Sequence, residues 1–183
     1  MSTRPEILFP LFKDLTALEG IGPKTADHMV GLAIERPKDL IFTLPQSGID
    51  RSVVSSVKDA LVPQTLTVEI TVGEHSPSRK KSGPYRINVV DAHTSFRLVF
   101  FHAHADYMKK ILPTGKRMVV SGKLESFDGV AQMVHPDHIL PSNQIDTIPK
   151  FEPVYPLTTG VTQKTMLKAT KSVLRLVPRL PEW

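Results

Sequence analysis

Residues 66–72 read Leu-Thr-Val-Glu-Ile-Thr-Val, and this strict alternation of apolar and polar side chains has the period of a β-strand. Because neighbouring side chains of a strand point to opposite faces, the apolar set would face a core. The sequence predicts four further strands, over 86–91, 96–101, 117–125 and 130–135. Asp128-Gly129 is a strong hairpin signal between the last two of them.

A short helix is predicted over 105–112, between the third and the fourth strand, and Pro113 and Gly115 would end it. Five strands with one helix in this position are the layout of an OB-fold, a small Greek-key barrel whose sheet face and loops bind oligonucleotides or oligosaccharides. We therefore expect a mostly β protein with flanking helices. Gly122, inside the fourth strand, fits a bulge or a sharp bend of such a barrel.

Helical patterns flank the predicted barrel on both sides. Residues 10–45 carry leucines at mostly helical spacing, interrupted by glycines and prolines, which predicts two or three short helices. After a proline-rich connector, a basic helix is predicted over about 162–176. The expected organisation is a helical unit over 1–50, an OB-fold domain over 51–145, and a linker with its helix over 146–183.

The composition of the 183 residues excludes several classes of protein. The sequence has no cysteine, so disulfides, thiol catalysis and cysteine-ligated zinc are excluded. The first ten residues do not form a signal peptide, and no apolar run reaches the length of a membrane span, so we expect a cytoplasmic protein with no membrane partner. The net charge is +5, and the positive excess lies after position 50, because residues 1–50 are net negative; this would suit a polyanionic partner.

The segment Leu18–Ala26 (LEGIGPKTA) has the form of a helix-hairpin-helix turn. Gly20 and Gly22 would let the backbone turn tightly and approach a phosphate, and Lys24 would add a positive charge. This predicts contact with a DNA backbone. The alternative is a plain connection between two packed helices.

The string His102-x-His104-x-Asp106 resembles the zinc-binding motif of metallo-β-lactamase-like hydrolases, and His135 and His138 follow further along the chain. Position 107 is Tyr where that family has a further histidine, and the chain lacks the elements of that four-layer fold. We therefore expect no metal site, no bound cofactor and no catalytic residue in this chain.

Alternation in the strand 96–101 places Phe96, Leu98 and Phe100 on one face and Phe101 on the other. If the first set fills the barrel, Phe101 stands outside it, and an exposed ring can stack on a base. The alternative is that Phe101 packs under the N-terminal helices. Arg79, Lys80 and Lys81 are expected in a loop that often faces the ligand in this fold, although a solvated basic loop without a partner is equally compatible with the pattern.

Several segments together resemble the RecG family of bacterial ATP-dependent DNA helicases, in the order and spacing of that family from about residue 15 to the end. These segments are Leu18–Ala26, Asp39–Pro45, Asp50–Ser52, Phe100-Phe101, Gly115–Arg117, Val120–Lys123, Gln132–Pro136 and Val154–Gly160. The resemblance implies that the chain is the N-terminal part of such a helicase, whose OB-fold wedge domain splits replication forks and Holliday junctions in recombination and repair. It also implies that ATP and Mg²⁺ are bound by downstream motor domains, which this chain does not contain.

The resemblance further implies site residues. By position Phe101 matches the first of two aromatic rings that family wedges stack on the bases at the junction, and Tyr107 is the candidate for the second. Two more residues precede Tyr107 than in the family, and His102 stands where the family often has Asn. Candidate phosphate-binding side chains are Arg79, Lys80, Lys81, Lys116, Arg117 and Lys123.

On this basis we expect a monomeric module that binds branched DNA and is not an enzyme by itself. The alternative is a stand-alone OB-fold module for single-stranded DNA or RNA, which would prefer single strands to forks.

Overall fold

The computed structural model describes residues 5–78 and 83–180, and these form two compact units. The first unit runs from Ile49 to Glu152. The second combines the described residues up to Gly48 with those from Pro153 onward. The division into 1–50, 51–145 and 146–183 stays a prediction, and the two units are described in turn.

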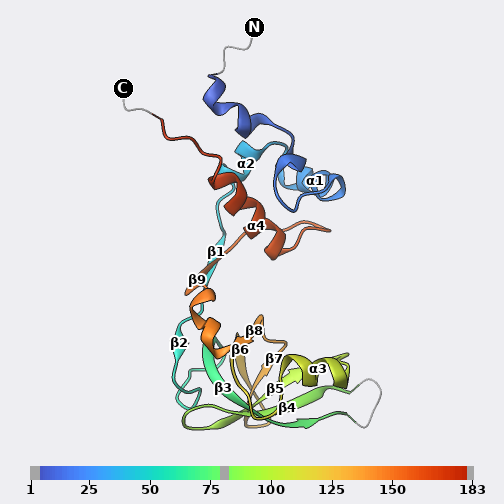
Figure 1. Cartoon of the computed structure of the whole chain (residues 1–183), viewed down its shortest axis with the longest axis vertical. Helices are drawn as coiled ribbons and strands as arrows, with labels where there is room; N and C mark the ends of the chain where they lie inside the picture. Colours follow the sequence, from blue (N-terminus) through green and yellow to red (C-terminus); the bar gives the residue numbers. More distant parts are fainter. Residues whose placement is uncertain (1–4, 79–82, 181–183) are drawn as a thin grey trace. The chain divides into compact units, whose positions relative to one another are not determined.

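Five strands of the described residues close into a barrel in the first unit (Figure 1). They are β3 (Gln64–Ser76), β4 (Tyr85–Val90), β5 (Ser95–Phe100), β6 (Arg117–Phe127) and β7 (Val130–Val134). β3 pairs with both β4 and β6, and the pairs β4–β5, β5–β7 and β6–β7 complete the ring. The β5–β7 pair is parallel and the other pairs are antiparallel. Helix α3 (Ala105–Ile111) connects β5 to β6, so the predicted OB-fold and its mostly β class with flanking helices are confirmed.

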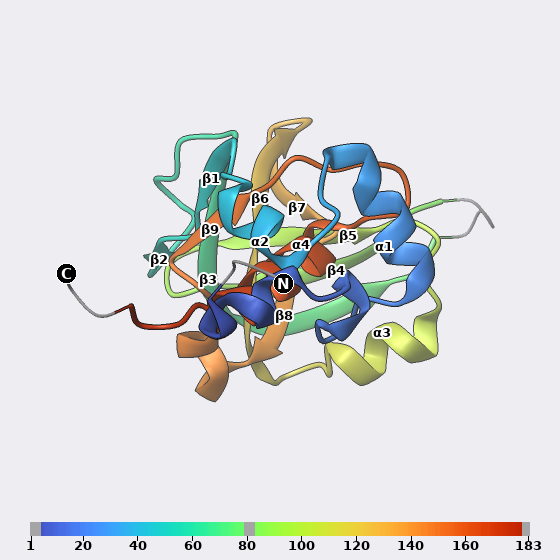
Figure 2. The ribbon, with the colours of Figure 1, turned by 90° about the horizontal axis from the view of Figure 1, so that it is seen from above.

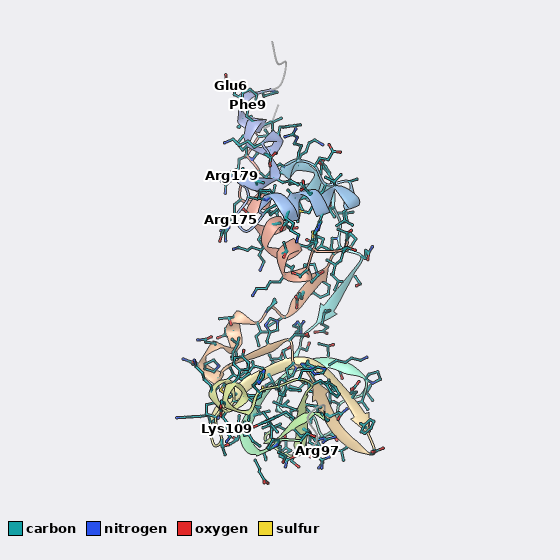
Figure 3. All side chains as sticks on the ribbon, turned by 90° about the vertical axis from the view of Figure 1, so that its right-hand side faces the viewer. Glu6, Phe9, Arg97, Lys109, Arg175 and Arg179 are labelled. Carbon is teal, nitrogen blue, oxygen red and sulfur yellow. The ribbon has the colours of Figure 1, made fainter. Side chains whose placement is uncertain are left out.

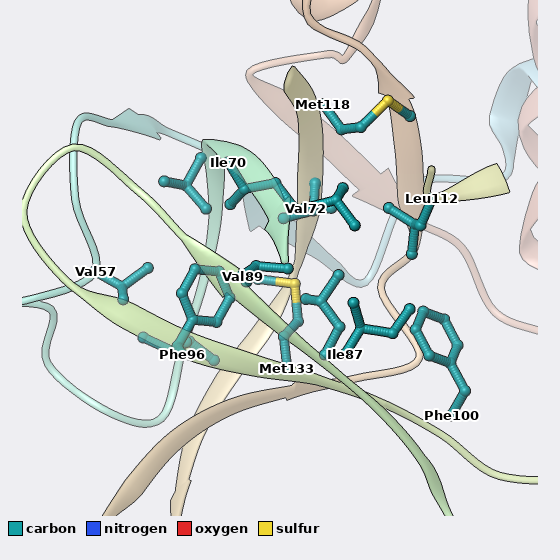
Figure 4. Packing of buried hydrophobic residues seen from close by; sticks show 14 of the residues in the cluster. Val57, Ile70, Val72, Ile87, Val89, Phe96, Phe100, Leu112, Met118 and Met133 are labelled. Atoms are coloured by element: carbon teal, nitrogen blue, oxygen red, sulfur yellow. The ribbon is translucent and has the colours of Figure 1, made fainter. Parts of the chain in front are cut away.

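The alternation that predicted the strands also builds the core of the barrel (Figure 4). The apolar side chains of 66–72 are all buried, and Phe96, Leu98 and Phe100 fill the barrel as one inward-facing set. Thr67 faces the other way and is nevertheless fully buried. Residues 51–52 cover it, since the Thr67 hydroxyl donates to the carbonyl of Arg51 and the Thr67 amide donates to that of Ser52.

A bulge lies in β3, and the β3–β6 pairing shows none at Gly122, so the bulge predicted there is corrected, while the alternative of a bend stays a prediction. Between Val72 and His75 the β3–β4 register gains one residue, so Gly73 and Glu74 stand opposite Asn88. A Cβ on Gly73 would come within 2.7 Å of the Asn88 carbonyl oxygen, which explains the glycine. Pairing between β3 and β6 is continuous past Gly122, where a Cβ would instead lie 3.0 Å from Sδ of Met133.

Short strands extend the barrel unit at its margins. β2 (Val53–Val54) pairs with β3, and β8 (His138–Pro141) pairs with β6. The 3₁₀ helix η4 (Ser142–Thr147) follows β8, and β1 (Ser47–Asp50) and β9 (Phe151–Val154) form a separate two-stranded sheet. These strands have four residues or fewer, too few for an alternating pattern to be visible in the sequence.

The second unit is helical, and its core combines residues 11–40 with residues 155–173. Its elements are η1 (Glu6–Phe12), η2 (Leu15–Ala17), α1 (Pro23–Met29), η3 (Val30–Leu32), α2 (Pro37–Phe42) and α4 (Gln163–Leu174). α2 and α4 lie close together in Figure 2 and are in contact, and Leu40 packs in one cluster with Met166 and Val173. Thr162 caps α4 by accepting a hydrogen bond from the Thr165 amide, so the predicted basic helix begins where the sequence indicated. Within the described residues, none of the helices combines the length and apolarity needed to span a bilayer.

Candidate nucleic-acid interface

A groove of about 510 Å³ crosses the outside of the barrel over β4, β5 and β7. Alternation creates its floor: every second side chain of β4 fills the core, so Arg86 and Asn88 point outward, and Arg97 of β5 does the same (Figure 3). Strand pairing then sets these side chains side by side, with Asn88 opposite Arg97 and Arg97 opposite Gln132 of β7. The floor is therefore polar and carries two positive charges.

These two guanidinium groups are available to a ligand. Both arginines are exposed, and among the described residues no acidic side chain forms an ion pair with Arg86 or Arg97. Asp128 is the acidic residue that lines the groove, at its hairpin end. A groove with unpaired guanidinium groups attracts phosphates through charge that does not depend on base sequence.

Phe101 lies at one end of this groove, immediately after β5. Its side chain is 46% exposed, as predicted if Phe96, Leu98 and Phe100 fill the barrel. The amide of Phe101 donates to Nε2 of His135 over 3.0 Å, and the centroids of the two rings are 5.8 Å apart. Phe101 thus presents a large apolar ring at the edge of a polar, positively charged floor.

A second exposed aromatic ring lines the groove at its other end. Phe127 is 61% exposed and belongs to the β6–β7 hairpin, whose Asp128 and Gly129 have φ angles of 51° and 73°. Such left-handed pairs form the two-residue turns of tight hairpins, which confirms the Asp-Gly signal in the sequence. Because β5 and β7 are parallel, the hairpin end lies at the start of β5 and Phe101 lies beyond its end.

Tyr107 lies elsewhere. It is on α3 and is 61% exposed, but it does not line the groove that contains Phe101. The structure therefore does not bring the two predicted stacking residues together in this groove.

The basic candidates on β6 and just before it, Lys116, Arg117 and Lys123, also lie outside the groove. All three are exposed, and Arg117 forms an ion pair with Glu69 of β3. This pairing leaves less of the Arg117 charge for a phosphate. Arg79, Lys80 and Lys81 lie outside the described residues, while Ser76 and Pro84, on either side of them, line the groove.

The predicted helix-hairpin-helix turn belongs to the helical unit. Gly20 has a φ angle of 82°, as the tight turn requires, Gly22 caps α1, and Lys24 is exposed. The turn is preceded by the 3₁₀ helix η2 rather than by an α-helix, and a Cβ on Gly20 would touch the Lys168 side chain of α4 at 3.2 Å. The turn therefore packs against α4, and its contact with DNA stays a prediction.

No site for a metal ion is formed by the histidines. In residues 5–78 and 83–180, no group of three or more His, Cys, Asp or Glu side chains is placed to hold one. His102 has a φ angle of 55°, so it ends the run of extended backbone directly after Phe101.

The sequence prediction selected only Phe101 among the described groove residues. Those that it missed include Arg86, Asn88, Arg97, Phe127 and Gln132. The sequence contained one usable signal, because Arg97 shares the outward face of 96–101 with Phe101. Arg86 and Gln132 could not be found in this way, since their place beside β5 depends on the pairing register of three strands.

Comparison with known proteins gives one family. The family model described as RecG wedge domain matches residues 14–177. The ATP-dependent DNA helicase RecG of Pasteurella multocida (strain Pm70) is 25% identical over 168 residues, which are 91% of this chain and 24% of that protein. The RecG of Aquifex aeolicus (strain VF5) is 31% identical over 126 residues, 68% of this chain and 15% of that protein.

A solved structure described as RecG bound to a three-way DNA junction matches with a TM-score of 0.70 and 22% identity, over 93% of this chain and 23% of that one. This likeness supports the fold. The chain spans about a quarter of the length of the RecG protein from P. multocida.

Proposed function

Because the chain belongs to the RecG wedge domain family, we propose that it binds branched DNA, such as a replication fork or a Holliday junction, and serves as the strand-splitting module of an ATP-dependent DNA helicase in recombination and repair. The observation that carries this proposal is the groove on the barrel, with exposed Phe101 at its edge and, on its floor, two arginines without an ion-pair partner among the described residues.

Phe101 would act at the point where the two strands part. When the last base pair of a duplex opens, the bases lose stacking on one side. An exposed aromatic ring can replace this stacking, which is worth about 1–3 kcal/mol per base. Phe101 is suitable for the task because its ring is exposed, while Phe100 directly before it fills the core.

The groove would hold one separated strand. Arg86 and Arg97 would neutralise its phosphates, while the exposed polar side chain of Asn88 beside them would contact sugars or phosphates. Both kinds of contact tolerate any base sequence, as a module that meets forks at arbitrary positions requires. Lys116, Lys123 and the turn at Gly20–Lys24 would add phosphate contacts outside the groove.

The module would be passive. The sequence contains no Gly-x-x-x-x-Gly-Lys-Ser/Thr loop for nucleotide phosphates, so the residues present do not fit ATP with Mg²⁺, and we derive no hydrolytic step from them. The work of unpairing would come from other domains of the helicase. We also propose that the module acts as a monomer in the bacterial cytoplasm.

Fluorescence-anisotropy titration tests the proposal. The 183-residue chain is titrated with a three-way fork, a matched duplex and a matched single strand, each at two salt concentrations. We expect the fork to bind most tightly and the affinity to fall as salt rises. Equal affinity for fork and duplex would contradict junction recognition, and a marked preference for the single strand or for RNA would favour the stand-alone OB-fold module instead.

A further inference from the structure

His135 approaches Phe101 in two ways. The Phe101 amide donates to Nε2 of the imidazole over 3.0 Å, and the two ring planes are tilted by 33° with their centroids 5.8 Å apart. The imidazole also packs edge-to-face with the Phe100 ring, with a centroid distance of 5.8 Å. The imidazole thus contacts one phenylalanine that fills the core and one that lies outside it.

The strands alone do not fix Phe101. The last pair between β5 and β4 is Phe100 with Tyr85, and the last pair between β5 and β7 is Val99 with Val134. Phe101 lies beyond both, in a turn, and is followed by a residue in the left-handed conformation. Its amide would therefore have no strand partner to hold it.

His135 supplies the missing partner from the end of β7. Its own amide still donates to the Val99 carbonyl over 2.9 Å, which continues the β5–β7 pairing by one residue. Its backbone then turns into the left-handed region, with φ of 45°, and its side chain accepts from the Phe101 amide. A side chain thus takes the place of a further strand residue.

We propose that His135 is a positioning residue for Phe101, holding its backbone so that the exposed ring is presented to the base at the junction; this rests on the function proposed above. A ring that is already fixed loses less conformational freedom on binding, so more of the stacking energy appears as affinity. The bond also sets the state of the imidazole. Because a backbone N–H can only donate, Nε2 accepts and carries no proton while the bond exists.

Two substitutions separate the hydrogen bond from the rest of the side chain. His135→Gln removes the ring but keeps an acceptor at about the distance of Nε2, whereas His135→Leu removes both. Neither substitute is aromatic or β-branched, so both variants lose the same ring contacts. A difference between them therefore reports the hydrogen bond.

Hydrogen exchange of the Phe101 amide measures the bond without DNA. We expect slow exchange in the unchanged chain and in His135→Gln, and fast exchange in His135→Leu. Fork titration with 2-aminopurine at the branch measures its effect on stacking. His135→Leu should weaken fork binding about threefold to tenfold, the range given by one hydrogen bond, and should reduce the quenching of 2-aminopurine, while His135→Gln stays within about twofold.

The His135→Leu substitution is also made in a chain that already carries Phe101→Ala, which shows whether His135 acts by positioning the Phe101 ring. There His135→Leu should cause no further loss, because no ring remains to be positioned. Equal fork binding and quenching in the Leu and Gln variants, or a full additional loss in the Phe101→Ala background, would overturn the inference while leaving the proposed function in place. If the unchanged chain shows no preference for the fork, the proposed function fails and this inference fails with it.

Discussion

In the barrel unit, Nε of Arg51 donates to Oε2 of Glu152 over 2.6 Å, across 101 positions of sequence. A terminal nitrogen of the same guanidinium reaches Asp137 at 2.9 Å and the Ser121 hydroxyl at 3.2 Å. The Arg51 side chain is only 3% exposed. Three distant parts of the chain therefore meet at one buried positive charge.

Replacing Arg51 with Met should lower the free energy of unfolding by about 2–4 kcal/mol, because the carboxylate of Glu152 would lose its charged hydrogen-bond donor and keep, among the described residues, only the imidazole of His138, 3.9 Å away. The Glu152 side chain is 13% exposed, so water does not fully replace the lost guanidinium. The control is Asp137→Asn: this side chain is 53% exposed, and an exposed pair is worth about 1 kcal/mol or less. Chemical denaturation of the three proteins checks the prediction, and an Arg51→Met cost no larger than that of the control would contradict it.

Asp91 directly follows β4, and its carboxylate accepts the hydrogen bonds that hold the next turn. It accepts hydrogen bonds from the amides of His93, Thr94 and Val57 and from the Ser56 hydroxyl. Burial alone would raise the pKa of this carboxyl. The hydrogen bonds outweigh burial, and the pKa of Asp91 is lowered from its usual value of 3.8.

A lowered folded-state pKa means that the unfolded chain takes up the proton more readily. The contribution of Asp91 to stability is therefore complete above pH 3.8 and is lost as the pH falls through the lower folded-state value. Asp91→Asn should cost about 1–3 kcal/mol at pH 7, because an amide nitrogen would face the Val57 amide, and this cost should shrink in acid. Urea denaturation at pH 7 and at pH 3 measures it. Exposed Asp59→Asn is the control, and a cost for Asp91→Asn that is unchanged or larger at pH 3 would refute the assignment.

The parts of the fold that local pattern determines could be predicted from the sequence. The strand over 66–72 shows its period in seven residues, and the Asp128-Gly129 turn is set by the backbone preferences of two. The bulge at Gly73 could not be predicted, because the requirement for glycine comes from the Asn88 carbonyl on another strand.

The candidate site also contains residues that could be selected from the sequence and residues that only strand pairing brings together. Alternation in 96–101 left Phe101 either exposed or packed under the N-terminal helices, and the resemblance to the RecG family selected it as the exposed ring. Arg86 and Gln132 join Arg97 only through strand pairing, so no pattern within their own strands reveals the groove. The buried Arg51 side chain likewise meets partners that are distant in sequence, which no local pattern reveals.

Phe101→Ala should weaken fork binding about tenfold or more, the loss of one base-stacking contact, with little change in the free energy of unfolding. The small effect on stability follows from the 46% exposure of the side chain. Tyr107→Ala is a matched control, because this ring is also exposed but lies outside the groove. Anisotropy titration and thermal denaturation of both variants test the assignment. Fork affinity that falls equally in the two variants would show that the groove is not the place where stacking occurs.

The salt dependence of binding identifies the arginines that contact phosphate. Each single-strand phosphate contact contributes about 0.7 to the slope of log Kd against log salt concentration. Arg86→Gln and Arg97→Gln should therefore each lower this slope by about that amount and weaken binding to all sequences alike. Arg117→Gln provides the control, since Arg117 is exposed but is paired with Glu69 outside the groove, and its removal should leave the slope nearly unchanged. If Arg117→Gln lowers the slope and the two groove variants do not, the separated strand follows the β3–β6 side of the barrel instead of the β4–β5 face.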